Sequence, residues 1–150
     1  MNQPFIPNLA QARPSREDTM TVIPMRSLRG NEPKDTAVAQ AEVRCVIMAR
    51  RMREAMLGDE LFADPAWDIL LELYAATLEQ RRVSTSELCV RSAAPATTAL
   101  RWIEKLASAG LLTRTNDSLD GRRVWVDLSG EAESKMESYF LAIGGIRRAI

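Results

Sequence analysis

The chain has 150 residues, no histidine and two cysteines, and its 20 basic and 20 acidic residues leave a formal net charge of zero. Because histidine is the commonest general base and metal ligand, a zinc site and a histidine-based triad are excluded, and we expect neither an enzyme nor a cofactor. No apolar run is long enough to cross a bilayer and the first residues lack a secretion signal, so we expect a cytoplasmic protein.

The charge is distributed unevenly along the chain. Residues 35–80 carry a net charge of −5, whereas residues 81–123 hold eight basic and four acidic side chains, a net charge of +4. Positive charge concentrated in one segment is typical of a surface that meets phosphates. The alternative is the ordinary fluctuation of charge along any chain, so this pattern supports nucleic-acid binding without proving it.

Residues 1–34 contain five of the seven prolines. Proline at this density blocks both helices and central strands, so we predict a flexible arm over 1–34 and a folded domain over 35–150. Four arginines of the arm could touch phosphates, although a tail without a function is the simpler interpretation.

The first long helix is predicted from Asp35, as its N-cap, to Leu57. Its apolar residues recur at steps of three and four and are Val38, Ala41, Cys45, Met48, Met52 and Met56. A second apolar set, Val43, Val46 and Ile47, widens this stripe. Because a helix that is apolar on more than one side needs more than one neighbour, we predict that residues 35–63 form part of a dimer interface. Cys45 is a candidate redox residue, but two structural thiols, Cys45 and Cys89, are the alternative.

The next helix is predicted from Asp64-Pro65, with Asp at the N-cap and Pro at the first position, to about Glu79. Its composition leaves little polar face, so we expect a buried central helix. A short extended link, Arg81-Arg82-Val83, follows it.

Two further helices are predicted from their end signals. Ser84 to Glu87 has the pattern of a capping box and begins a short helix that ends near Ser92. Pro95 suits the first position of the following helix, and Gly110 is the expected residue after its last turn. Such a pair of helices, joined by a tight turn at 93–94, is typical of a helix-turn-helix.

A hairpin and a last helix complete the predicted domain. Leu111 to Asn116 is a strand, 117–121 is a turn-rich loop, and Arg122 to Leu128 is the return strand. Ser129 caps the last helix, which we expect to end at Gly144-Gly145 and to leave a tail over 146–150.

The helix after Pro95 divides into two faces. Its inner face is predicted to contain Ala99, Trp102, Ile103 and Leu106. The outward residues near its start carry hydroxyl, methyl and guanidinium groups, which suit base edges and phosphates. An arginine on the hairpin tip suits the minor groove, where Asp120 is expected to hold Arg122 by a charge-assisted hydrogen bond. The predicted DNA-binding residues are Ser84, Thr85, Pro95, Ala96, Thr97, Thr98, Arg101, Lys105, Asp120, Arg122 and Arg123. Both features also fit an ordinary solvated surface with incidental charges.

Three segments resemble the MarR family of bacterial transcriptional regulators. They are Ser84–Cys89, then Thr97-Thr98 with Leu106 and Gly110–Leu112, and finally Asp120, Arg122, Val126, Leu128 and Ser129. The resemblance covers about 64–132 and implies a homodimer on a pseudo-palindromic operator, with the terminal helices as the interface. It also implies that the protein is a repressor. Many members of the family release DNA when they bind a small-molecule effector or when a cysteine is oxidised.

These observations predict a mainly α-helical fold with a small β-hairpin wing (α+β), a winged helix-turn-helix. Residues 64–128 are its DNA-reading unit and 129–150 its C-terminal helix and tail. The predicted function is a sequence-specific regulator that binds double-stranded DNA, with helix 95–109 in the major groove and wing 116–123 in the minor groove or on the backbone. The alternative is a winged-helix module that binds another protein and has no specific DNA site.

Overall fold

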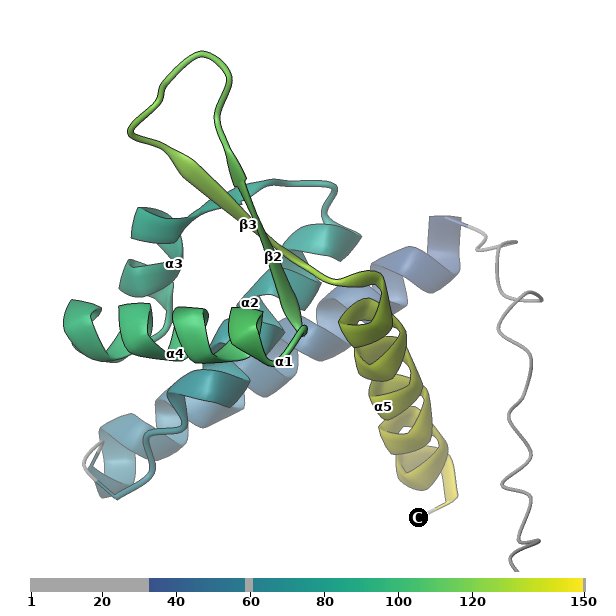
Figure 1. Cartoon of the computed structure of the whole chain (residues 1–150). Coiled ribbons are helices and arrows are strands. Elements are labelled where there is room, and N and C mark those ends of the chain that lie inside the picture. Colours follow the sequence, from purple (N-terminus) through teal and green to yellow (C-terminus); the bar gives the residue numbers. More distant parts are fainter. Residues whose placement is uncertain (1–32, 59–60, 150) are drawn as a thin grey trace, which may run out of the picture. The chain divides into compact units, whose positions relative to one another are not determined.

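A computed structural model describes residues 33–58 and 61–149, and most of the predicted arm over 1–34 lies outside them. Helices dominate the described residues (Figure 1). Three short strands form one small antiparallel sheet. The elements are α1 (Pro33–Leu57), α2 (Pro65–Leu78), β1 (Val83–Ser84), α3 (Thr85–Arg91), α4 (Ala96–Ser108), β2 (Leu112–Asn116), β3 (Val124–Leu128) and α5 (Gly130–Ala149). The predicted winged-helix fold is therefore confirmed.

Helix α2 is the centre of the fold, because it contacts α1, α3, α4 and β3. Its start is fixed as predicted: Pro65 is the first residue, and the Asp64 carboxylate accepts a hydrogen bond from the Trp67 amide at 3.3 Å. Ile69 and Leu71 are completely buried. The prediction of a buried central helix is confirmed.

Helix α1 begins two residues earlier than predicted, at Pro33, so that Asp35 lies in its first turn and is not its cap. The predicted stripe from Val38 to Met56 does not face the core. Met48 is 64% exposed and Met52 58% exposed, whereas Val43, from the second apolar set, is fully buried. Helical periodicity finds an apolar stripe but cannot say which of two stripes meets the body of the protein.

Three acidic side chains of α1 and α2 lie in the interior of the fold. Glu54, Asp68 and Glu72 are buried, and each is close to arginine. Asp68 accepts a 2.7 Å hydrogen bond from Arg50 Nε, and Arg51 Nη1 lies 3.5 Å from its second oxygen. Burial of these carboxylates is tolerated because a cation neutralises each of them.

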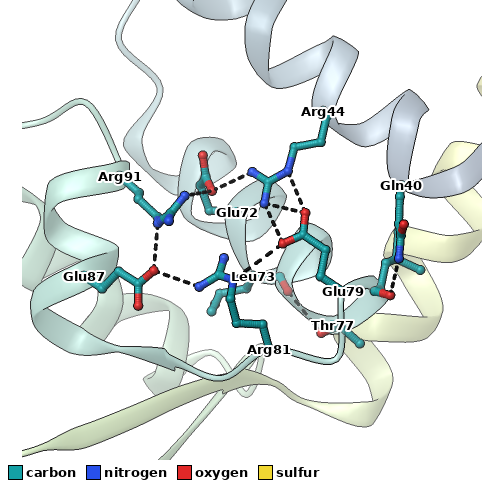
Figure 2. A network of polar contacts seen from close by, with 10 residues as sticks. Gln40, Arg44, Glu72, Leu73, Thr77, Glu79, Arg81, Glu87 and Arg91 are labelled. Atoms are coloured by element: carbon teal, nitrogen blue, oxygen red, sulfur yellow. Dashed lines mark hydrogen bonds and ion pairs between the residues drawn. The ribbon is translucent and has the colours of Figure 1, made fainter. Parts of the chain in front are cut away.

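Six side chains of alternating charge form a closed ring between α1, α2 and α3 (Figure 2). In order around the ring they are Arg44, Glu72, Arg91, Glu87, Arg81 and Glu79. The contact between Arg44 and Glu79 is a fork of two 2.8 Å hydrogen bonds. Arg51 Nη2 also donates to the Arg91 carbonyl oxygen at 2.7 Å, so α1 is attached to the last residue of α3.

The sheet has the order β1-β3-β2, and its first strand was missed because it is only two residues long. Val83 pairs with Val126 and Ser84 with Trp125. The sequence predicted an extended link here, and its extended backbone supplies an edge strand to the hairpin. Strand β3 contributes to the core, because Val126 is fully buried and Leu128 is 8% exposed.

Helix α5 begins after Ser129, whose hydroxyl accepts from the Ala132 amide at 3.2 Å, as predicted. It does not end at Gly144-Gly145 but continues to Ala149. Glycine weakens a helix by about 1 kcal/mol without terminating it, so the expected short helix with a tail is wrong. None of the helices within 33–58 and 61–149 has the length and apolar character that a bilayer crossing requires.

Candidate nucleic-acid interface

Helix α3 is held at both ends. The Ser84 hydroxyl accepts from the Glu87 amide at 3.2 Å, which confirms the predicted cap, and Thr85 Oγ1 donates to the Val124 carbonyl oxygen of β3 at 3.1 Å. At the other end Ser92 Oγ donates to the Cys89 carbonyl oxygen at 3.0 Å. The Thr85 bond attaches the start of α3 to the first residue of β3, beside the wing loop.

The turn from α3 to α4 contains a residue in the left-handed region: Ala93 has a φ of +51°. Helix α4 then begins at Ala96. Pro95 is the residue before the helix and not its first residue, because its carbonyl accepts from the Ala99 amide at 2.9 Å while its own ψ of 139° is extended. The prediction that Pro95 takes the first helical position is therefore wrong by one residue.

The end of α4 follows the prediction. Gly110 has a φ of +75°, its amide donates to Ala107 and the Leu111 amide donates to Leu106, both at 3.0 Å. This is the hydrogen-bond pattern of a Schellman cap, which favours glycine because of the positive φ. The cap directs the chain straight into β2.

The two faces of α4 are mostly as predicted. Ala99, Ile103 and Leu106 are buried, whereas Trp102 is only half-buried and has Lys105 Nζ 4.5 Å from its ring centre. The expected outward residues are exposed, except for Thr98, which is half-buried. The exposed ones are Pro95, Ala96, Thr97, Arg101 and Lys105.

The wing loop between β2 and β3 is organised by two aspartates. Asp120 Oδ1 accepts a hydrogen bond from the Arg122 backbone amide at 3.1 Å, but its ion pair is with Arg123, at 3.8 Å. Asp117 also pairs with Arg123, at 3.6 Å, and a hydrogen bond from the Leu119 amide, aided by that arginine, lowers the pKa of its carboxyl. The expectation that Asp120 orients the Arg122 side chain is therefore corrected: it fixes the backbone there.

A groove of about 660 Å³ lies between α3, the start of α4 and the hairpin. It brings together four predicted residues from separate segments: Thr85, Ala96, Arg122 and Arg123. On another side of α4, a hollow of about 230 Å³ is lined by Thr98, Arg101, Trp102 and Lys105. The predicted site residues on α4 thus divide between two hollows.

Other residues that line the larger groove were not predicted from the sequence, among them Arg114 on β2, Leu100 on α4 and Val90 on α3. Arg114 was counted in the positive charge of 81–123 but was not assigned to the site. Its place in the predicted wing could have indicated it, since Arg114 lies on the strand that leads into the loop with Arg122 and Arg123. Leu100 and Val90 gave no signal, because an apolar residue next to an apolar face is assumed to be buried.

The cations of residues 81–123 fall into two groups, those that pair with a carboxylate and those that do not. Arg81 and Arg91 belong to the ion-pair ring, Arg82 lies 3.7 Å from Asp127, and Arg123 pairs with two aspartates. The second group contains Arg101, Lys105, Arg114 and Arg122. Within the part of the chain that the structure describes, no carboxylate pairs with any of them.

The comparisons with known proteins agree with this geometry. Residues 66–132 match the family model of a winged helix DNA-binding domain. The MepR–DNA complex of S. aureus is similar in structure, with 17% identity, a TM-score of 0.52 and coverage of 72% of this chain and 87% of that one. A mutant form of MepR from a multidrug-resistant S. aureus clinical isolate has 14% identity, a TM-score of 0.52 and coverage of 75% and 76%.

A MarR family transcriptional regulator from Silicibacter pomeroyi is a further similar structure, with 17% identity, a TM-score of 0.48 and coverage of 83% and 82%. No curated protein matches this sequence. The matched domain model and the structural neighbours confirm the winged-helix fold that the sequence predicted.

Proposed function

We propose that this chain, which carries a winged helix DNA-binding domain over residues 66–132, is a sequence-specific transcriptional regulator that binds double-stranded DNA and acts as a repressor. The observation that supports this most is the second group of cations. Arg101, Arg114 and Arg122 lie on α4 and the wing, and within the described residues no carboxylate neutralises them. Unpaired arginines beside an exposed helix start suit a partner rich in phosphate.

In the proposed complex the start of α4 enters the major groove. Thr97, exposed, and Thr98 offer hydroxyls to bases or phosphates, and Arg101 can reach a guanine edge. The wing, residues 116–123, then lies over the adjacent minor groove or backbone with Arg122 at its tip. The hydrogen bond from Thr85 to Val124 supports this arrangement, because it holds the helix pair and the wing together.

We also propose a homodimer in which the exposed stripe of α1 meets a second copy. Val38, Met48 and Met52 are each more than half exposed, and an apolar stripe of this length in water favours a partner. The MepR–DNA complex is similar in fold to this chain, which supports the DNA binding that the dimer would serve. Two reading units related by a two-fold axis would require a palindromic operator.

A hollow of about 630 Å³ between α2 and α5 is the proposed place for a small-molecule effector. Trp67, Leu70, Met136 and Tyr139 give it an apolar and aromatic lining, with Lys135 beside them. Such a lining suits an aromatic ligand. The redox role of Cys45 stays a prediction; the thiol is exposed on the stripe of α1, whereas Cys89 is buried and burial raises its pKa.

The test is selection of bound sequences from a random duplex library with the full chain, followed by binding of the selected duplex at several salt concentrations. We expect a palindrome with half-sites about 10 base pairs apart, and an affinity that falls steeply as salt rises. The matched control is the Arg101→Glu, Arg122→Glu double variant, which should select nothing. Failure of the unmodified chain to enrich any sequence, with salt-independent weak binding, would favour the protein-binding module instead.

A further inference from the structure

An apolar patch lies on the surface proposed to meet DNA. Val90 of α3 is 83% exposed and Leu100 of α4 is 43% exposed, and both line the groove of about 660 Å³. Ala94 and Ala96 line the same groove between them. Apolar residues of α3, of the turn and of α4 therefore line one open groove, which is different from a single leucine at a helix surface.

The groove also limits what can cover this patch. Arg114 and Arg122, which pair with no carboxylate among the described residues, line its other side, so the groove suits a partner that carries negative charge next to apolar groups. A duplex meets both requirements. Its backbone supplies phosphates, and in the major groove the 5-methyl group of thymine is the apolar group that an unmodified base presents.

Leu100 is placed to reach base edges and not only the backbone. It lies one turn after Ala96 and Thr97, on the exposed part of α4 and beside Arg101. A recognition helix presents residues of its first turns to the bases. Leu100 has no hydrogen-bonding group, so any specificity that it confers must come from apolar contact.

We infer that Leu100, with Ala96 and Val90 beside it, is a specificity-determining surface that reads thymine methyl groups in the operator. The inference rests on the proposed function. It adds that the side of α4 facing the groove recognises the methyl groups of thymine bases. The half-site must then contain at least one thymine whose methyl group is covered by this patch, next to the bases read by Thr97 and Arg101.

The experiment replaces each thymine of the selected operator half-site by deoxyuridine, one at a time, and measures the affinity of the full chain. Uracil keeps the Watson–Crick pairing and removes only the methyl group. At one or two positions we expect the affinity to fall about fourfold, the effect of one buried methyl group. The remaining thymines should show no change.

A variant assigns the effect to the patch. Leu100→Ala should bind the thymine operator more weakly and should lose the sensitivity to uracil at those positions, while Leu100→Met should keep it. The matched control is Leu61→Ala, at a leucine that is 84% exposed outside the reading unit, and it should behave like the unmodified chain. Circular dichroism should show that all three variants are folded.

Two results would overturn the inference while leaving the proposed function intact. One is a selected half-site whose affinity does not change with any uracil substitution. The other is a sensitivity to uracil that is the same in Leu100→Ala as in the unmodified chain, which would show that Leu100 does not read the methyl group. Absence of any selected sequence would instead contradict the proposed function itself.

Discussion

Arginines are used in two different ways in two regions of this molecule. Between α1, α2 and α3 they are enclosed by carboxylates: Arg50 is 13% exposed and 2.7 Å from Asp68, and Arg44 holds Glu79 by a two-bond fork. On α4 and the wing, Arg101 and Arg122 are exposed, and among the described residues no carboxylate pairs with them. The comparison teaches that a count of charge along the sequence mixes cations that build the protein with cations that are available to a ligand.

The two regions meet at α3. Arg91 is part of the ion-pair ring (Figure 2). Its carbonyl oxygen also accepts a hydrogen bond from Arg51, and it is the last residue of α3 before the turn into α4. The enclosed region therefore positions the helix on which the open region is mounted. A change in the first region should affect the free energy of unfolding, and a change in the second should affect DNA affinity.

The largest effect is expected from Asp68→Ala. Removal of this buried carboxylate leaves Arg50 without the carboxylate that it pairs with, and breaking a buried ion pair costs about 3–5 kcal/mol. Urea denaturation followed by circular dichroism should show this loss in the free energy of unfolding. Glu104→Ala, which removes an exposed carboxylate of α4, is the control and should unfold like the unmodified chain. A loss below about 1 kcal/mol in Asp68→Ala would mean that the enclosed pairs do not stabilise the fold.

The next largest effect belongs to the open region. Arg101→Ala and Arg122→Ala should each weaken operator binding by about 1–3 kcal/mol, roughly 5- to 150-fold, with the free energy of unfolding unchanged. Arg44→Ala is the matched change in the enclosed region. It should lower the free energy of unfolding by about 1–2 kcal/mol and leave the affinity of the folded protein unchanged. The distinction between the two regions would be wrong if the Arg101, Arg122 and Arg44 variants all changed the free energy of unfolding, or all changed the operator affinity.

A smaller effect is expected at the turn between the regions. Ala93 has a φ of +51°, which costs an L residue about 1 kcal/mol, so Ala93→Gly should raise the free energy of unfolding by about 0.5–1 kcal/mol. Ala49→Gly, at an exposed position inside α1, should lower it by about 1 kcal/mol. Thermal melts of the two variants should move in opposite directions. A shared direction would show that the turn is not strained.

The smallest expected effect is a dependence on pH within the enclosed region. Burial alone would raise the pKa of the Glu79 carboxyl, but the hydrogen bonds and charges of Arg44 and Arg81 outweigh it and lower that pKa. The resulting stabilisation is present above the unfolded pKa, about 4.3, and is lost as the pH falls through the folded value.

Free energies of unfolding measured from pH 6 down to pH 3 should therefore decline less steeply in Glu79→Gln than in the unmodified chain. Arg44→Gln should flatten the same part of the curve, because it removes the cation that lowers this pKa. Parallel curves in all three proteins would show that the ring contributes nothing to acid sensitivity.

Local signals in the sequence predicted much of the fold. Caps are short-range features, and so Asp64, Ser84, Gly110 and Ser129 were assigned correctly from the residues next to them. Features that depend on contacts between distant residues were not predicted correctly. The pairing of Val83 with Val126 joins residues 43 apart in the sequence, and the side of α1 that faces the core is decided by where α2 lies.

The site was predicted unevenly for the same reason. The outward face of α4 follows from helical geometry, and Ala96, Thr97 and Arg101 are exposed as expected. The partner of Asp120 does not follow from spacing, because a carboxylate in a tight turn can accept from a nearby amide or pair with either following arginine. Nor does the exposure of Leu100, since it depends on the groove that the hairpin leaves open beside α4.

Ser84 has two structural tasks at once. It pairs with Trp125 as the last residue of an edge strand, and its hydroxyl caps α3. An engineer who exchanged the hairpin for one from a related protein would therefore disturb the start of α3 unless Val83, Ser84 and Thr85 were transplanted with it. Chimaeras of such proteins should be cut before Val83, so that wing and helix pair are inherited as one piece.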